Sequence, residues 1–432
     1  MALTRRTAVA ALTGVFVVFV VPLHGWMVLF TEGLLVLGIV VDLACAGSVR
    51  ALEVSRYGDT ARRLDESAAL GVVVVNRGTR RVRGVLRDAW PPSAGASPAR
   101  QHIDVPAGER RRLTTTLHPS RRTELQAGFV SVRSVGPLGL AARQGNHAAP
   151  WSLRVLPAFP SRKFLPEKLA KLRLLDGRTA ARVRGQGTEF DSLRDYVGGD
   201  DARSIDWRAT ARRSAVVVRT WRPERDRRLL LVLDTGRTSA ARIGDGTRLD
   251  AALDSALLLG ALASRAGDRV DLMAVDDRPR LLVRGSEGPG DSLAGLLRSM
   301  AGLQPRLVET DGRRLAAEVL RRTSHRALVV LFTTLDEAAI SEGLLPVLPS
   351  LTARHTVLVA SVSDPVVTAM ATERGDTHAV FDAAAAERTL AGQRRIAGLL
   401  RRLGVDVVEG DPGEFASKVA DAYLSLKAAG KL

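Results

Sequence analysis

Two apolar segments at the start of the chain constrain its fold more than any other feature. Residues 8–21 carry no charged side chain, and a second apolar run covers residues 26–46 after a short break at residues 22–25. The second run is long enough to span a membrane, since about 20 apolar residues cross the hydrocarbon core as a helix. No small-x-small cleavage site follows the first run, which argues against a removed signal peptide. Residues 1–48 are therefore predicted to form a transmembrane helical hairpin.

The arginines around this hairpin predict its orientation. Arg5 and Arg6 precede the first run, further arginines follow the second, and the connecting turn has no Lys or Arg. The positive-inside rule then places both termini and the soluble domains in the cytoplasm. Glu32 and Asp42 interrupt the second run, and we expect them to face the partner helix or an interface. The alternative is a helical hairpin buried in a soluble core.

The net charge of the chain does not identify its partner. At 432 residues the chain is long enough for two or three domains, and its formal net charge is +17. The arginines are spread along the sequence and interleaved with Asp and Glu, whereas a nucleic-acid-binding arm gathers them in one place. The single cysteine, Cys45, excludes an intramolecular disulfide and a cysteine-based zinc site. We expect a membrane and a protein as partners, and no nucleic acid.

Two different strand patterns follow the hairpin. Residues 49–160 contain short β-branched runs bounded by Gly, Pro and Asn, such as LGVVVVNRG (70–78), which predict a small immunoglobulin-like β-sandwich. Over residues 227–432, continuous apolar strands such as RRLLLVLD (227–234) alternate with helical patterns such as residues 248–267. This alternation predicts a doubly wound α/β domain, in which function lies beyond the carboxyl ends of the strands.

Residues 161–226 link these two domains and contain a charge-rich segment, Gly185–Arg213. The segment mixes carboxylates, arginines, aromatic residues and glycines, so it is too charged for a core and too aromatic for a plain linker. The residues that we expect to carry its role are Glu189, Asp191, Arg194, Tyr196, Asp200, Asp201, Arg203, Asp206, Trp207 and Arg212.

Two interpretations of this segment remain open. It is either a docking surface, on which Arg194, Arg203 and Arg212 pair with carboxylates of a partner, or an internal network of salt bridges. In the second interpretation the network holds the segment to the α/β domain, with Tyr196 and Trp207 buried against it. The near balance of charges favours internal pairing, and the two interpretations are compatible.

The end of strand 227–234 offers a candidate site for a cation. Asp234 opens the sequence DTGRTS, in which a carboxylate is followed by hydroxyl side chains. Such oxygens are the ligands that Mg²⁺ prefers. The alternative is a turn in which Asp234 or Thr238 only satisfies backbone N–H groups at a helix start.

These features together resemble a bacterial family. The hairpin, SVGPLGL (134–140), the segment 187–212, the strand ending in Asp234 and the terminal YLSLK (423–427) are similar to "domain of unknown function fifty-eight" proteins. The resemblance covers nearly the whole chain, and its most specific part is residues 187–212. It implies that the C-terminal half has a von Willebrand factor type A-like fold and acts as a protein–protein interaction module. In such families this module is often paired with a membrane-linked MoxR-type AAA+ ATPase.

The resemblance also implies a metal-ion-dependent adhesion site, which this chain has in degenerate form. Such a site combines an Asp-x-Ser-x-Ser loop, a Thr from a second loop and an Asp after the fourth strand. The positions expected to correspond in this chain are Asp234, Thr238, Thr310 and Thr334. Gly236 replaces the first serine, and Thr333-Thr334 stand where Thr-Asp is expected. Mg²⁺ is the ion that such a site would hold.

No catalytic group emerges from the sequence. It has no Gly-x-Ser-x-Gly elbow and no phosphate loop, and His325 and His355 lie near strand starts, at the end of the sheet opposite the expected site. We therefore expect a non-enzymatic, membrane-anchored cytosolic adaptor that works with an AAA+ ATPase. The alternatives are a metal-dependent hydrolase acting at Asp234 with carboxylates from residues 189–206, and a structural cell-envelope protein.

Overall fold

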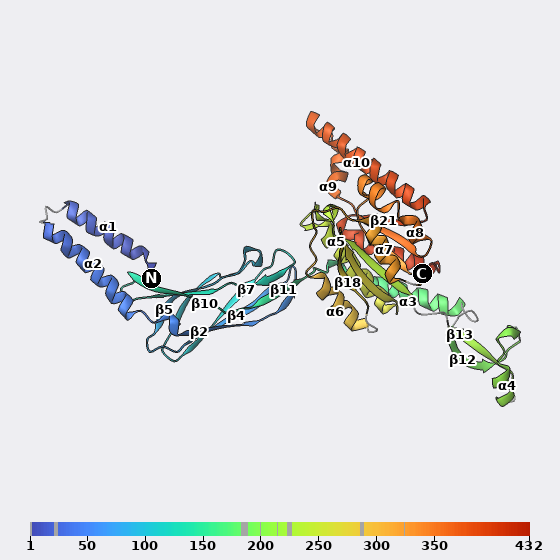
Figure 1. Ribbon diagram of the computed structural model, residues 1–432, viewed down its shortest axis with the longest axis horizontal. Helices are drawn as coiled ribbons and strands as arrows, with labels where there is room; N and C mark the ends of the chain where they lie inside the picture. Colours follow the sequence, from blue (N-terminus) through green and yellow to red (C-terminus); the bar gives the residue numbers. More distant parts are fainter. Residues whose placement is uncertain are drawn as a thin grey trace. The chain divides into compact units, whose positions relative to one another are not determined.

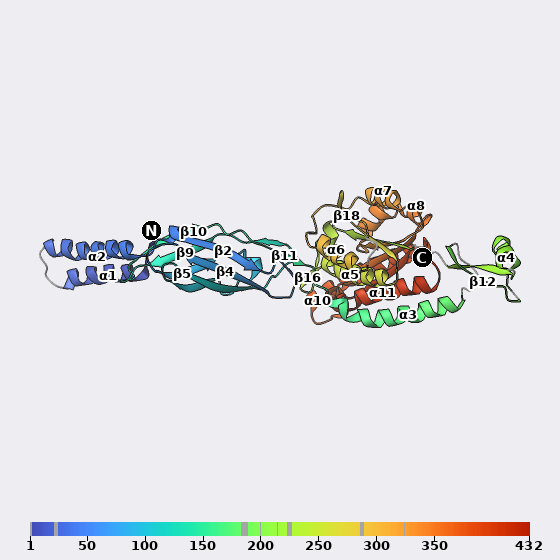
Figure 2. The same ribbon diagram turned by 90° about the horizontal axis from the view of Figure 1, so that it is seen from below.

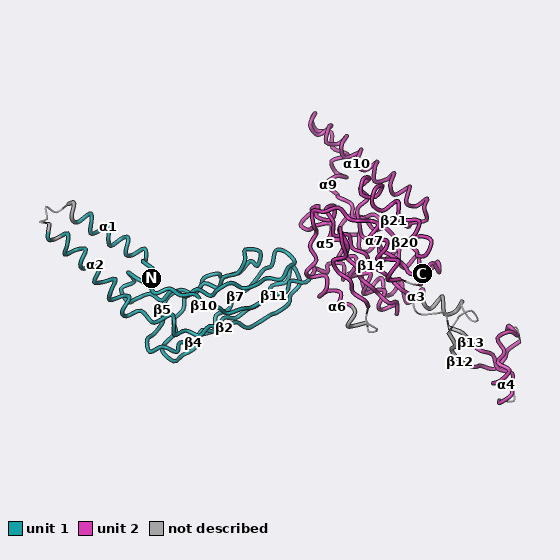
Figure 3. Tube along the Cα trace, in the orientation of Figure 1, with its two compact units in different colours: residues 1–156 teal, residues 157–432 magenta. Residues whose placement is uncertain are grey.

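The computed structural model forms two compact units, Met1–Leu156 and Pro157–Leu432 (Figure 1, Figure 3). Each unit has its own hydrophobic core. The residues that the structure describes are 2–20, 25–182, 189–198, 200–213, 215–222, 227–285, 289–323 and 325–432.

The first unit contains a layered β domain. Its strands are β1 (Ala2–Leu3), β2 (Leu52–Gly58), β3 (Ala61–Arg63), β4 (Ala68–Asn76), β5 (Val82–Asp88), β6 (Arg100–Val105), β7 (Arg110–Leu117), β8 (Glu124–Gln126), β9 (Val130–Val135), β10 (Ala141–His147) and β11 (Ser152–Leu156). They form a five-stranded sheet, β1-β10-β9-β5-β6, and two three-stranded sheets, β2-β4-β7 and β3-β11-β8. Val72 and Val74 of β4 share one buried core with Leu86 of β5 and Val132 of β9, as predicted for a small β-sandwich.

A buried ion pair lies inside this β domain. Nη2 of Arg56 on β2 lies 2.6 Å from Oδ1 of Asp88 at the end of β5, and the two side chains are 0% and 1% exposed. Trp90 donates a hydrogen bond from Nε1 to the second carboxylate oxygen of Asp88 (3.0 Å). The guanidinium carbon of Arg56 lies 5.7 Å from the centre of the Trp90 ring. The two buried charges therefore compensate each other, because either one alone would be costly in this environment.

Two apolar helices, α1 (Arg5–Val20) and α2 (Gly25–Cys45), run side by side at the N-terminus (Figure 1, Figure 2). Within the part of the chain that the structure describes, one helical segment, Val28–Ala51, is long and apolar enough to cross a membrane. The helices leave large apolar side chains exposed, including Leu12, Phe16, Leu29, Phe30 and Leu34. A continuous apolar surface of this kind is typical of a face that meets lipid or another protein.

Both ends of the helical pair are joined to the same edge of the β domain. β1, just before α1, pairs antiparallel with β10. Near the end of α2, the buried carboxylate of Asp42 accepts hydrogen bonds from the backbone N–H groups of Leu138 (2.7 Å), Ala141 (2.9 Å) and Leu140. Asp42 therefore faces an interface, as expected from the sequence, whereas Glu32 is exposed on α2.

The second unit is built on a six-stranded sheet in the order β18-β17-β14-β19-β20-β21. Its strands are β14 (Arg228–Asp234), β17 (Arg269–Val275), β18 (Pro279–Val283), β19 (Leu328–Phe332), β20 (Thr356–Val362) and β21 (Asp406–Gly410). Its helices are α3 (Leu165–Arg182), α5 (Arg248–Arg265), α6 (Pro289–Met300), α7 (Gly312–Arg322), α8 (Leu348–Thr352), α9 (Pro365–Thr372), α10 (Thr377–Arg402) and α11 (Pro412–Ala428), with a π-helical turn, η6 (Ala339–Leu344). β18 is antiparallel to β17, and the other neighbouring strands are parallel.

Helices cover both faces of this sheet. Leu229, Leu231 and Leu233 of β14 belong to a core with α5 and α11, whereas Leu230 and Val232 belong to a core with α7, α8 and α10. Figure 2 shows α3 and α11 on one side of the sheet and α7 and α8 on the other. Burial on both faces explains why these strands are continuous apolar runs in the sequence, and it confirms the predicted doubly wound α/β arrangement.

The strand order directs attention to one place on this sheet. The chain passes from β14 to β17 on one side, and the later strand β19 pairs with β14 on the other side. In open α/β sheets, ligands bind outside the carboxyl ends of the strands where the order reverses in this way. Here that place is the junction between the ends of β14 and β19.

Candidate functional site

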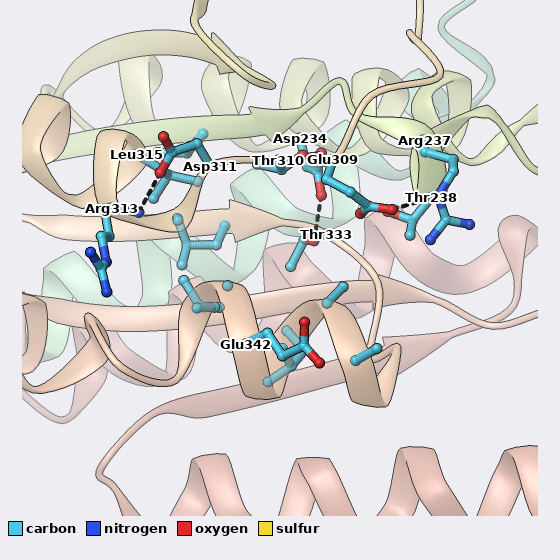
Figure 4. Close-up of a pocket in the computed structure, with 18 of the residues that line it drawn as sticks. Asp234, Arg237, Thr238, Glu309, Thr310, Asp311, Arg313, Leu315, Thr333 and Glu342 are labelled. Carbon is cyan, nitrogen blue, oxygen red and sulfur yellow. Dashed lines mark hydrogen bonds and ion pairs between the residues drawn. The ribbon is translucent and has the colours of Figure 1, made fainter.

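A cavity of about 390 Å³ opens at the carboxyl ends of β14 and β19 (Figure 4). Its walls come from the two strand ends, the loop that precedes α7, the start of α7 and the η6 turn. The polar residues that line it are Asp234, Arg237, Thr238, Glu309, Thr310, Asp311, Arg313, Thr333 and Glu342. The cavity therefore lies where the strand order predicts a ligand site.

Asp234 lies at the inner end of the cavity and is only 7% exposed. Its Oδ1 accepts hydrogen bonds from the backbone N–H of Gly236 (2.8 Å) and the hydroxyl of Thr310 (2.5 Å). Its Oδ2 accepts a hydrogen bond from the hydroxyl of Thr333 (2.7 Å), a contact drawn in Figure 4. Burial raises the pKa of Asp234, the nearby carboxylate of Asp276 acts in the same direction, and the three hydrogen bonds oppose them.

Gly236 makes room for the loop that carries Thr310. Its φ of −76° and ψ of −172° suit any residue, so backbone strain does not require glycine here. A Cβ at this position would lie 2.2 Å from the Thr310 hydroxyl oxygen and 3.0 Å from the Val308 carbonyl oxygen. The loop is also held by a hydrogen bond from the Arg237 N–H to the Val308 carbonyl (2.8 Å). Glycine at 236 is therefore a consequence of close packing between two loops.

The structure brings together only some of the residues expected to bind a cation. Asp234 and Thr310 are in contact, and Thr238 lines the cavity without a described hydrogen bond to Asp234. Thr333, the residue before the expected Thr334, donates a hydrogen bond to Asp234. The Thr334 hydroxyl is buried and has no hydrogen-bond partner among the described residues.

The oxygens of these residues make hydrogen bonds with one another. Asp234 is their single carboxylate, and three donors already point at it. Among the residues that the structure describes, no group of three or more His, Cys, Asp and Glu side chains is arranged to hold a metal. Mg²⁺ prefers oxygen ligands in a regular octahedron, and in the described structure the oxygens around Asp234 are engaged in hydrogen bonds with one another.

The outer part of the cavity carries more acidic than basic side chains. Arg237 donates to Glu309 (2.7 Å) at one side. Asp311 accepts hydrogen bonds from the backbone N–H groups of Arg313 and Arg314 (both 3.0 Å) and so caps α7. Glu342, on η6, is exposed and has no ion-pair partner among the described residues.

The loop before α7 also exposes a large apolar side chain beside these residues. Leu307 is 81% exposed, more than any other large apolar residue described. Its neighbours in the chain are fixed, because the Arg306 N–H donates to the Thr235 carbonyl (2.8 Å) and the Val308 carbonyl accepts from Arg237. Leu307 is thus held out from an ordered loop at the carboxyl end of the sheet.

The charge-rich segment forms a small module of its own. β12 (Glu189–Asp195) and β13 (Val217–Arg222) pair antiparallel, with α4 (Trp207–Arg213) between them. Arg194 makes a two-pronged contact with Asp200 (2.8 and 2.6 Å). This ion pair agrees with the interpretation that the segment's charges are matched internally.

Asp206 is the second organising carboxylate of this module. It accepts hydrogen bonds from the backbone N–H groups of Arg208 and Ala209 (both 3.0 Å), which caps α4, and from the Arg219 side chain (2.8 Å). Asp201 accepts from the Arg203 N–H (2.9 Å). The side chains of two further expected residues, Glu189 and Asp191, lie outside what the structure describes.

The aromatic residues of the module are not buried, in contrast to the expectation that they pack inward. Trp207 is 66% exposed and Tyr196 is 40% exposed. Arg203 and Arg212 are also exposed, with no side-chain ion pair among the described residues. Asp200 and Asp206 are paired within the module, whereas the described aromatic side chains and the side chains of Arg203 and Arg212 are exposed on its surface.

Thr333 and the rim residue Glu342 were not identified from the sequence. The parallel register pairs Leu233 of β14 with Phe332 of β19. The next residue along the chain is Asp234 in one case and Thr333 in the other. Counting from the end of each apolar run would therefore have placed Asp234 beside Thr333. No sequence signal marks Glu342, because η6 is a π-helical turn whose position depends on packing.

Comparison with solved structures gives only weak likenesses. The CARDB domain of a Pyrococcus furiosus protein, in complex with di-metal ions, is 16% identical, covers 24% of this chain and 91% of its own, and has a TM-score of 0.18. An uncharacterized membrane spanning protein from Vibrio fischeri is 14% identical, covers 47% of this chain and 99% of its own, and has a TM-score of 0.16. Likenesses at these TM-scores carry no argument about function. No curated protein matches the chain.

The family comparison is more informative. The family described as "Protein of unknown function DUF58" matches residues 192–391. The matched region includes most of the module with Trp207, the strand end at Asp234 and the loop with Thr310. This match supports the assignment of the chain to that family.

Proposed function

We propose that this chain is a membrane-anchored protein-interaction module that binds a partner at the carboxyl ends of β14 and β19. The observation that carries the proposal is the cavity at this junction, which is lined by a buried carboxylate, together with the exposed Leu307 two residues before the lining residue Glu309. Exposed apolar side chains held on ordered loops are typical anchors of protein interfaces. No observation supports bond-making chemistry at Asp234, whose oxygens are already engaged by three donors.

The proposal includes a von Willebrand factor A-like identity for the α/β domain. Numbered along the chain, the strands of its sheet read 3-2-1-4-5-6, with the third strand antiparallel. The DTGRTS loop follows the first of these strands, as the resemblance to that fold implies. In this chain the loop is closed by hydrogen bonds from Thr310 and Thr333, so we propose partner binding without a metal ion.

The proposal also includes anchoring through α1 and α2, with the soluble parts in the cytoplasm. The exposed apolar surface of the helices supports insertion into a membrane. Both ends of the pair are tied to β10 and its preceding turn, so they belong on one side of the membrane. Arg5, Arg6 and Arg50 flank those ends, which favours the cytoplasmic side.

The partner that the family resemblance suggests is a MoxR-type AAA+ ATPase. A crosslinking pull-down of the full chain from membranes tests this, with Leu307→Glu as the interface variant. Leu174→Glu is the matched control, since Leu174 is 68% exposed on a different element, α3. Capture of an AAA+ ATPase by the wild type and the control, but not by Leu307→Glu, would support the proposal.

Two outcomes would contradict this proposal. An ATPase that is captured equally by the Leu307→Glu variant does not bind at this face, and failure to enrich any AAA+ ATPase removes the suggested partner. Protease accessibility in intact cells then separates the remaining alternative, a structural envelope protein. That role requires the β domain outside the cell, whereas the proposal requires it to be protected.

A further inference from the structure

The geometry points to a recognition pocket for one cationic side chain, an arginine or lysine of the protein partner, in the cavity beside Asp234. This inference rests on the proposed function, because it names the chemistry by which the partner enters that site. It differs from a metal site, since the cation would arrive as part of a protein and would bring its own hydrogen-bond donors.

The walls of the cavity suit the aliphatic part of such a side chain. They include Val232, Leu315, Leu331, Ile340 and Leu344. A volume of about 390 Å³ is near the lower end of ligand pockets, which run from about 300 to 1,000 Å³. Lys and Arg bury their methylene stems against apolar surface while the charged end reaches a polar group. The apolar walls of this cavity would contact the methylene stem, and the carboxylate of Asp234 would accept from the charged end.

Asp234 retains capacity for one more donor. A carboxylate offers about four lone-pair sites, and three of them are used by Gly236, Thr310 and Thr333. Two of these donors bind Oδ1 and one binds Oδ2. Oδ2 is therefore the oxygen that can accept a further hydrogen bond. The existing hydrogen bonds also fix the orientation of the carboxylate, so little conformational entropy is lost when a cation binds to it.

The rim favours a cation over an anion. Its acidic side chains are Glu309, Asp311 and Glu342, and its basic ones are Arg237 and Arg313. Arg237 is paired with Glu309, and Glu342 is exposed without an ion-pair partner among the described residues. An anion could meet Arg313, but the carboxylate of Asp311 already accepts the backbone N–H groups at the start of α7, and the carboxylates of Asp234 and Glu342 would repel an anion. Figure 4 shows Glu342 on η6 below the cavity and Asp234 above it, so acceptors lie on both sides.

A side chain fits this acceptor set better than a metal ion does. Guanidinium and ammonium groups carry three to five N–H donors and need only a few acceptors around them. A divalent ion usually binds several charged ligands, and among the described residues no group of three or more His, Cys, Asp and Glu side chains is arranged to hold one. The exposed Leu307 beside the cavity favours a protein as the source, since a free amine would gain nothing from it.

The test uses the full chain in lipid nanodiscs and a pair of small probes, N-acetyl-arginine amide and its neutral isostere N-acetyl-citrulline amide. Binding is measured by ligand-observed NMR. We expect the arginine probe to bind and the citrulline probe to bind at least about tenfold more weakly, because hydrogen bonds to a charged group are the stronger ones. Equal binding of the two probes would overturn the inference.

Variants then locate the binding. Glu342→Gln is expected to weaken binding of the arginine probe by about two- to fivefold, as for an exposed ion pair. Asp234→Asn is expected to weaken its binding by more than about tenfold. Glu373→Gln is the control, since Glu373 is exposed after α9 and does not line the cavity. Hydrogen exchange of the β14 and β19 peptides verifies that each variant is folded. If Glu342→Gln and a folded Asp234→Asn both bind like the wild type, the pocket is not the site. Loss of probe binding on removal of Mg²⁺ would also refute the inference, in favour of a metal.

The outcomes separate this inference from the proposed function. If the ATPase is captured in a Leu307-dependent way but equally by Glu342→Gln and Asp234→Asn, the interface stands and the cationic pocket fails. If the arginine probe binds in an Asp234-dependent way but no ATPase is captured, the pocket stands and the proposed partner fails.

Discussion

A substitution at Gly236 tests the idea that two loops, rather than a metal, organise the end of β14. In Gly236→Ala the new Cβ would lie 2.2 Å from the Thr310 hydroxyl oxygen, where an ordinary contact is at least 3.4 Å. The loop must move by about 1 Å, and the hydrogen bond from Thr310 to Asp234 is lost. Overpacking costs about 1–3 kcal/mol and the loss of a hydrogen bond to a carboxylate about 1.5–3 kcal/mol, so we expect about 2.5–6 kcal/mol.

The second substitution, Thr310→Ala, removes the obstacle. On its own it should cost about 1–3 kcal/mol, because Asp234 keeps the donors from Gly236 and Thr333. In the double variant the nearest remaining atom to the new Cβ is the Val308 carbonyl oxygen at 3.0 Å, a contact that a shift of a few tenths of an ångström relieves. The hydrogen bond is then lost only once. The double variant also avoids the overpacking, so it should be about 2.5–6 kcal/mol more stable than the sum of the two single effects predicts.

Hydrogen exchange of peptides from β14 and β19, in the full chain, measures the free energy of opening of this sheet. Gly302→Ala is the matched control, because a Cβ at Gly302 would meet no atom within 4 Å. We expect the control to stay within about 0.5 kcal/mol of the wild type. Additive effects of the two single substitutions would refute the reasoning, since they would mean that the Cβ at 236 does not compete with the Thr310 side chain.

Three further substitutions test other parts of the structure. Burial raises the pKa of Asp254 to about 6, against an ordinary 3.8, so the folded state binds its proton more tightly and stability falls as the pH rises from about 4 to about 6. Asp254→Asn should remove this slope and stabilise the chain at pH 8 by up to about 3 kcal/mol, measured by urea unfolding at both pH values; an unchanged slope would contradict the assignment. Asp88→Ala leaves Arg56 buried without its partner and should destabilise the β domain by about 3–5 kcal/mol, seen as faster exchange in β2 and β5 but not in β14. Asp42→Ala removes the acceptor of three backbone N–H groups and should speed exchange at residues 138–141, while unchanged exchange there would show that α2 is held by other contacts.

The α/β domain was predictable because both faces of its sheet are covered. Strands buried on two sides become continuous apolar runs, such as residues 229–233, and these stand out in a sequence. The alternation of such runs with helices then indicates the layered arrangement. The 26-residue helix α10 was not predicted as a unit, and few of its residues are buried. An exposed helix has no strong apolar period for a sequence to display.

The candidate site was predictable in place but not in detail. Asp234 and Thr310 meet as expected, but the third partner is Thr333, because the register between β14 and β19 sets which threonine faces the carboxylate. Register is a long-range property, and a shift of one residue reverses the face. The exposure of Trp207 was missed for a related reason. Charge balance predicted internal ion pairs, which Arg194 and Asp200 do form, but it carries no information on which way an aromatic side chain points.

The two departures from the metal-site pattern have one physical explanation. A serine at 236 would add a Cβ where the Thr310 hydroxyl now lies, so the glycine that removes one oxygen ligand also admits the hydroxyl that replaces it. A second carboxylate at 333 or 334 would lie beside Asp234 in a buried site, and without a metal two such carboxylates would repel each other. A threonine at 333 instead donates to Asp234 and stabilises it. Gly236, Thr310 and Thr333 thus form one consistent alternative to a metal ion. Under the proposed function, a partner would bind at this end of the sheet through the adjoining cavity, where Asp234 and Glu342 still have acceptor capacity.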